Sequence, residues 1–191
     1  WGYRKTWDKI RNDVADTVAI VNVVGGLAPD TEEPMPEAQQ ALIAGYWQQV
    51  ADKTGAQFNF DFWHKNIARR STYNACRAVI AAKMQNVEQA MITAIQQGYY
   101  LRALNPSDKP ILIQLFTELA NAQPRLNIQQ FCDDFSSSAV QTELMRQIQL
   151  SRELSQHGFP SLVLEENGQR RRINHDYKDH QATRDQILKH C

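Results

Sequence analysis

The chain has 191 residues, of which 42% are hydrophobic, and its 21 basic residues balance its 21 acidic residues. This length suits one domain, or one domain with an insertion, and it allows a real hydrophobic core. The zero net charge argues against binding through an excess of cations, so we expect no nucleic-acid partner. No apolar run approaches the ~20 residues that cross a bilayer, so we expect no membrane span.

The first part of the chain predicts a helix, a strand and a second helix. Residues 1–15 carry apolar residues at helical spacing with no N-cap residue before them, so we expect a further segment to precede Trp1. Residues 17–24 (TVAIVNVV) are almost continuously apolar and β-branched, which is typical of a strand buried on both faces. Gly25-Gly26 indicates a turn after this strand, and residues 37–53 indicate the second helix.

The middle of the chain is predicted to be helical throughout. We expect helices over 72–85, 87–104, 108–121, 127–135 and 137–156. The expected N-caps of these helices and of the last one are Thr72, Ser107, Asn127 and Asp179. An irregular, aromatic-rich stretch precedes the helices. Its rings are interpreted as core, or else as the lining of an apolar groove: Phe58, Phe60, Phe62 and Trp63.

The C-terminal part predicts a hairpin and a helix. Residues 161–165 and 170–177 are the expected strands, because Asn167-Gly168 between them is a strong two-residue turn. Residues 179–190 are the expected helix. An isolated hairpin is too small to be stable, so it needs the strand at 17–24, and one more strand, to complete a sheet.

The phrase Gly158-Phe159-Pro160 stands directly before the hairpin. On local sequence alone a trans bond before Pro160 is favoured, because cis bonds make up only about 5–6% of X-Pro bonds. A Gly-x-Pro-Ser element that enters a terminal hairpin and helix is, however, where thioredoxin-fold proteins carry a cis-proline loop.

The chain as a whole resembles the DsbA-like thioredoxin-fold family, and within it the predicted disulfide isomerases related to FrnE. The phrases that carry the resemblance run along nearly the whole chain in the family's order. They are Trp1-Gly2-Tyr3, Val23-Val24-Gly25-Gly26-Leu27 with Pro29, Glu33-Pro34-Met35, Gly55, Phe58-Asn59-Phe60-Asp61-Phe62, Cys76-Arg77-Ala78-Val79 and Gly158-Phe159-Pro160.

The resemblance implies an α/β chain with a thioredoxin-like fold and a large all-helical insertion. It divides the chain into a first thioredoxin-like part (1–64), the insertion (65–152) and a second thioredoxin-like part (153–191). It also implies a Cys-x-x-Cys motif just upstream of Trp1, outside this sequence. The function implied for the intact protein is that of an enzyme, a thiol–disulfide oxidoreductase or protein-disulfide isomerase.

The resemblance also names site residues. In the family a helix N-terminus stabilises a thiolate, and a second thiol resolves the mixed disulfide. Pro160, which would position an extended substrate, and Phe159, which would contact it, are the catalytic candidates. Trp1, Gly2 and Gly158 are the candidates for substrate binding. The expected partners are thiols and disulfides of proteins or peptides, no cofactor is expected beyond the redox-active disulfide, and a cytoplasmic location is favoured over a periplasmic one.

Two other functions use the same fold. A kappa-class glutathione transferase or isomerase would carry a serine near the same helix start and would need glutathione as its cofactor. A non-catalytic peptide-binding module would carry neither the serine nor the cysteine pair. Trp1-Gly2-Tyr3 is typical of the oxidoreductases and atypical of the transferases, so the first function is favoured, and the residues before Trp1 discriminate all three.

The other reactive side chains indicate no second site. Cys76 and Cys132 lie on predicted helices and are interpreted as small buried hydrophobic residues, whereas Cys191 is terminal. Arg170-Arg171-Arg172 is interpreted as a solvated strand edge. The histidines lack metal-ligand spacing, so no metal is expected. They are His64, His157, His175, His180 and His190. His157 is interpreted as a solvated histidine at a helix end, with the tuning of a nearby thiolate as the alternative.

Overall fold

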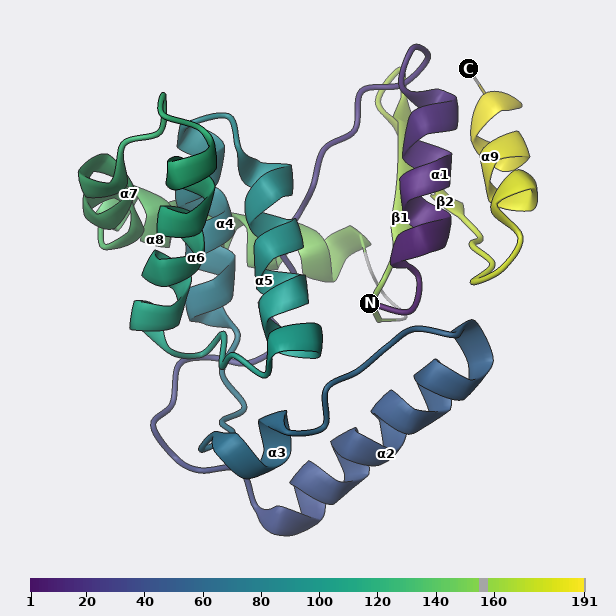
Figure 1. Cartoon of the computed structure of the whole chain (residues 1–191). Coiled ribbons are helices and arrows are strands. Elements are labelled where there is room, and N and C mark those ends of the chain that lie inside the picture. Colours follow the sequence, from purple (N-terminus) through teal and green to yellow (C-terminus); the bar gives the residue numbers. More distant parts are fainter. Residues whose placement is uncertain (155–157, 191) are drawn as a thin grey trace.

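The computed structural model describes residues 1–154 and 158–190. Figure 1 shows two regions: a helical bundle on one side, and a sheet unit of two helices and a hairpin on the other. A long helix, α2 (Glu37–Thr54), runs beneath both regions in this view. In the described part of the chain, no helix is both long and apolar enough to cross a lipid bilayer.

The helical bundle has a dry core centred on one helix. Its members are α4 (Tyr73–Met84), α5 (Glu88–Arg102), α6 (Lys109–Ala122), α7 (Ile128–Phe135) and α8 (Ser138–Leu154). Five successive residues of α4, from Ala78 to Ala82, are buried, so this helix is covered on all sides. Phe116 of α6 and Phe131 of α7 stack with ring centroids 3.9 Å apart and are fully buried. These helices confirm the expected ones to within two residues at their described ends.

The expected N-caps divide into two that form and two that do not. The side chain of Asn127 accepts a hydrogen bond from a backbone N–H of α7, and that of Asp179 accepts two at the last helix. The prediction is wrong for Ser107, because the helix begins one residue later, after Asp108. Thr72 occupies the N-cap position of α4 as expected, but it makes no capping hydrogen bond, because its hydroxyl accepts a hydrogen bond from the N–H of Ala28. A tertiary contact therefore takes the place of the cap.

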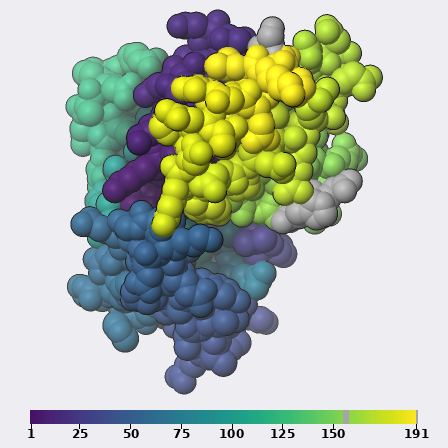
Figure 2. All heavy atoms as spheres, turned by 90° about the vertical axis from the view of Figure 1, so that its right-hand side faces the viewer, coloured from purple at the N-terminus to yellow at the C-terminus, as the bar shows by residue number. Residues whose placement is uncertain are grey.

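The sheet unit contains one antiparallel hairpin. Strand β1 (Leu162–Glu166) pairs with β2 (Gln169–Ile173), with Leu162 opposite Ile173. Asn167 and Gly168 both have positive φ, at 50° and 76°, which is the conformation of a type I′ turn. Helices α1 (Arg4–Val14) and α9 (His180–Leu188) pack on this hairpin. Figure 2 shows α9 lying over α1 on the face opposite the bundle.

The expected strand at 17–24 is wrong, because this stretch forms no ladder hydrogen bonds in the structure and is an irregular connection. Its side chains divide between two cores: Val18 and Ile20 pack against the sheet unit, and Val24 against the bundle. The N–H of Val24 donates to the side-chain oxygen of Gln147 at 2.9 Å rather than to another strand. A strand requires a neighbouring strand, so apolar, β-branched composition alone does not make one.

The aromatic-rich stretch joins α2 to the bundle. Trp47 of α2 is buried, and its ring lies 5.0–5.9 Å, between centroids, from six other rings. They are Phe58, Phe60, Phe62, Trp63, Tyr99 and Tyr100, of which Phe62 and Trp63 lie on α3 (Phe62–Lys65). Burial raises the pKa of Tyr100 to about 12. The core interpretation is thus confirmed for Phe62, whereas Phe60 is partly exposed.

The division of the chain at 64 and 152 remains a prediction.

Candidate functional site

The loop that enters β1 presents an aromatic side chain to solvent. The peptide bond between Phe159 and Pro160 is cis, and Gly158 before them has a φ of 99°. The hydroxyl of Ser161 donates to the carbonyl oxygen of Gly158, which closes the loop. Phe159 is 53% exposed, although a large apolar side chain is ordinarily buried. His157, named above as a candidate, lies outside the described residues, as do residues 155–156 and Cys191.

Phe159 rests on the backbone that follows the irregular connection. A Cβ atom placed on Gly25 would lie 2.5 Å from Cζ of Phe159. The neighbouring Gly26 has a φ of 52° and faces Ile148 of α8 and Tyr73 of α4. The glycine pair therefore lies at the junction between the bundle and the loop before β1. Sequence analysis assigned the pair to a turn and missed its contact with Phe159.

The start of α1 contacts a different part of the molecule. The ring of Trp1 stacks on Tyr100 at a centroid distance of 5.3 Å, and its Nε1 donates to the carbonyl oxygen of Gln57 at 2.8 Å. A Cβ on Gly2 would lie 2.5 Å from Cγ1 of Val50 of α2, so a glycine here allows α1 and α2 to approach closely. Trp1 and Gly2 thus dock the first turn of α1 on α2 and α5.

The first turn of α1 also has a favourable charge for an anion. It contains no acidic residue and begins with Arg4, whose guanidinium also pairs with Asp8 of the next turn at 3.4 Å. The guanidinium of Arg4 donates to Gln96 and Thr93 of α5, which ties this turn to the bundle. The partial positive charge of a helix N-terminus adds to that of the guanidinium. A thiolate bound at this turn would be stabilised.

The two groups of candidates have different neighbours. Phe159 contacts Gly25, whereas Trp1 and Gly2 contact α2, Gln57 and Tyr100. Figure 1 draws the N-terminus and the residues that lead into β1 at the same, lower end of the sheet unit. The roles assigned to Pro160, Phe159, Trp1, Gly2 and Gly158 in substrate handling stay predictions.

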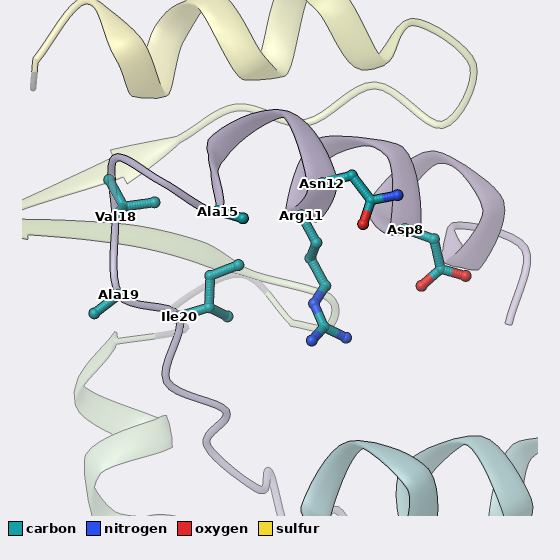
Figure 3. Close-up of a pocket in the computed structure, with 7 residues that line it drawn as sticks. All are labelled: Asp8, Arg11, Asn12, Ala15, Val18, Ala19 and Ile20. Atoms are coloured by element: carbon teal, nitrogen blue, oxygen red, sulfur yellow. The ribbon is translucent and has the colours of Figure 1, made fainter.

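The sheet unit also contains an open strand edge and a cleft. Within residues 1–154 and 158–190, β1 has a strand partner only on the side of β2. A cleft of about 630 Å³ opens between α1 and the irregular connection. Figure 3 shows the side chains of Arg11 and Ile20 projecting toward this space. It is lined by Asp8, Arg11, Asn12, Ala15, Val18, Ala19 and Ile20.

One imidazole of the sheet unit has a lowered pKa. The ring of His175 lies 4.9 Å from that of Tyr3, and burial together with Arg172 lowers its pKa. Burial likewise raises the pKa of the Tyr3 hydroxyl. Both groups therefore favour the uncharged state, which keeps this wall of the sheet unit apolar in character.

Cys76 is a poor nucleophile. Burial raises the pKa of the Cys76 thiol, the reverse of what disulfide exchange requires, and Cys76 and Cys132 are both free and pack against the bundle core. Arg170 to Arg172 are exposed, which confirms the solvated edge, and Arg170 pairs with Glu165 at 2.8 Å. No cluster of three potential metal ligands occurs among the residues that the structure describes.

Comparison with known proteins gives a family and a set of shared folds. The model of the family described as thioredoxin matches residues 1–181. A candidate protein disulfide isomerase from Nitrosomonas europaea is similar in structure, with a TM-score of 0.81, 23% identity and coverage of 99% of this chain and 89% of that one.

The cytosolic disulfide reductase DsbM from Pseudomonas aeruginosa is also similar, with a TM-score of 0.71, 18% identity and coverage of 91% and 84%. The structure of DsbM with GSH gives a TM-score of 0.69, 17% identity and coverage of 91% and 85%. No curated protein matches the chain. At these identities the solved structures establish the common fold.

Proposed function

Because the chain belongs to the thioredoxin family, we propose that the intact protein is a DsbA-like oxidoreductase that exchanges thiols and disulfides with protein or peptide substrates. The observation that carries the proposal is the loop of Phe159 and Pro160, which presents an exposed ring directly before a strand with one open edge. Such a loop can hold an extended peptide by backbone pairing, with the ring against a substrate side chain.

The reacting thiols belong in this proposal to a Cys-x-x-Cys motif that directly precedes Trp1. A strand ending in that motif would pair with the open edge of β1 and lead into α1. The cleft beside α1 and the unpaired connection at 17–24 support this placement, because both border the place where another strand would join the sheet. The first turn of α1, with Arg4 and no carboxylate, would lower the pKa of the first thiol.

The exchange balances without any other reagent. The thiolate of the first cysteine attacks a substrate disulfide, so one S–S bond forms as another breaks, and one substrate sulfur leaves as a thiolate. The thiol of the second cysteine then loses its proton and attacks the mixed disulfide. The protein dithiol becomes a disulfide and the substrate disulfide becomes a dithiol. Run in reverse, the same steps oxidise the substrate.

The test uses the full-length protein, beginning at its natural N-terminus. Intact mass, N-terminal peptide mapping and thiol counting establish which residues precede Trp1. We then expect the protein to accelerate the reduction of insulin by dithiothreitol, and replacement of either cysteine of the motif by serine to abolish the acceleration. The double variant Cys76→Ser/Cys132→Ser is the matched control and should keep full activity, because both thiols are partly buried.

A protein with no cysteine pair before Trp1, or with no effect on insulin, would disprove the oxidoreductase. A lone serine at that place would direct the next assay to glutathione transfer. If neither a cysteine pair nor a serine is found there, the remaining function is that of a peptide-binding module.

We favour a cytoplasmic location, since DsbM, a structural neighbour, is described as cytosolic.

A further inference from the structure

Gly25 lies directly against the ring of Phe159. The three heavy atoms nearest to a Cβ placed on Gly25 all belong to this ring, at 2.5, 2.8 and 3.0 Å. A real Cβ does not approach other atoms so closely. An alanine at position 25 would therefore displace the ring of Phe159.

The two glycines of the pair are required for different reasons. Gly26 has a φ of 52°, where side chains are strained, and a Cβ there would collide with Ile148 in the bundle. Gly25 is not among the residues with positive φ, so its backbone would accept alanine without strain. Its need for glycine comes from the ring of Phe159 alone.

The backbone that carries Gly25 is anchored on the bundle. On one side, the N–H of Val24 donates to the buried side chain of Gln147. On the other, Ala28 exchanges hydrogen bonds with Thr72 at the start of α4, at 3.0 and 3.1 Å. The surface beneath the ring is thus held by the bundle, whereas Phe159 itself is half exposed.

We propose that Gly25 is a positioning residue: its bare backbone seats the ring of Phe159, and thereby sets the preference of the site for an apolar substrate side chain next to the reacting cysteine. This inference rests on the proposed function. The outer edge of the ring, Cζ, Cε1 and Cε2, lies against Gly25, and Phe159 is 53% exposed, so the ring can cover an apolar side chain of an extended peptide only while it stays seated.

The contact of the Phe159 ring with Gly25 is tested by a measurement that does not depend on enzyme activity. Protein labelled with ring-13C phenylalanine is compared by NMR with its Gly25→Ala variant, and Phe159→Leu identifies the signal. We expect the Phe159 signal to move in Gly25→Ala with little loss of stability. Gly45→Ala is the control, because Gly45 has open space around it, and should leave the signal in place. An unmoved signal in Gly25→Ala overturns the proposal.

The preference is tested on the full-length enzyme with two disulfide-containing peptides that differ only in leucine or serine beside one cysteine. We expect the ratio of their kcat/KM values to favour leucine, and to fall about 10-fold in Gly25→Ala. In the Phe159→Ala background, Gly25→Ala should change the ratio no further. If Gly25→Ala lowers the ratio equally in the wild-type and Phe159→Ala backgrounds, the positioning role is overturned.

The two failures are distinguishable. If full-length protein reduces neither peptide nor insulin, the proposed function fails and the substrate preference falls with it. If it reduces both peptides with the ratio unchanged in Gly25→Ala, the function stands and only the positioning role is lost.

Discussion

The bundle and the sheet unit differ in how completely each is built. In the bundle, neighbouring helices bury a continuous core, which includes Phe116 and Phe131, fully removed from solvent. The sheet unit joins the two ends of the chain around a smaller core, and β1 pairs on one side in the described residues. The helical region therefore buries its core through its own contacts, whereas in the region with the candidate site β1 has one edge without a strand partner among the described residues.

The largest effect should come from the bundle core. Phe131→Ala removes a ring that stacks on Phe116 at 3.9 Å, so it should lower the free energy of unfolding by about 3–5 kcal/mol. Urea titration followed by circular dichroism measures this loss. Met84→Ala, at a 55% exposed position of α4, is the control and should cost less than about 1 kcal/mol. If Phe131→Ala lowered the free energy of unfolding by no more than the control does, the bundle would not be the better packed region.

A smaller effect should come from the contact between the irregular connection and the bundle. Gln147 is buried and accepts the N–H of Val24, so Gln147→Ala leaves that N–H without its partner and should cost about 1–3 kcal/mol. Amide hydrogen exchange at Val24 should speed up in the same variant. Gln149→Ala, an exposed neighbour on α8, should change neither quantity. Unchanged exchange at Val24 would contradict the anchoring of this segment to α8.

The smallest effect should be a pH dependence in the sheet unit. The pKa of His175 is lowered in the folded protein, so the unfolded chain binds more protons as the pH falls through about 6.5. Stability should therefore rise with pH across that window and decline below it, by less than about 1 kcal/mol because solvent screens a partly exposed ring.

His175→Phe keeps a ring beside Tyr3 and should flatten this pH dependence, measured as Tm between pH 5 and pH 8. His64→Gln, at an exposed position of α3, should retain it. A dependence that survives in His175→Phe would assign the titration to another group.

Most helices could be predicted from the sequence because their patterns are local. The helix expected over 72–85 spans 73–84 in the structure, and Asn127 is the N-cap of α7 as expected. The strand at 17–24 could not, because a strand depends on a partner that local composition does not reveal. Thr72 likewise occupies its N-cap position without a capping hydrogen bond, since its hydroxyl bonds to Ala28 of a loop distant in sequence.

The candidate site was predictable only in part. Phe159 and Pro160 were named from a family resemblance, while local statistics favoured a trans bond and the structure has a cis one. The contact of Gly25 with Phe159 joins residues far apart in the chain, so no local pattern indicates it. The sequence signal for this contact is the glycine pair itself. Only Gly26 has the positive φ that a turn requires, so the turn does not explain the glycine at position 25.

The cluster of rings around Trp47 has an optical consequence. Of the four tryptophans, Trp47 and Trp63 belong to it, Trp1 stacks on its Tyr100, and Trp7 packs against the core of the sheet unit, while residues 73–154 contain none. Tryptophan emission therefore does not report on the interior of the bundle, although most of the helical signal in circular dichroism originates there. The fluorescence of this protein instead reports how α1, α2 and α5 pack around the ring cluster, together with the core of the sheet unit.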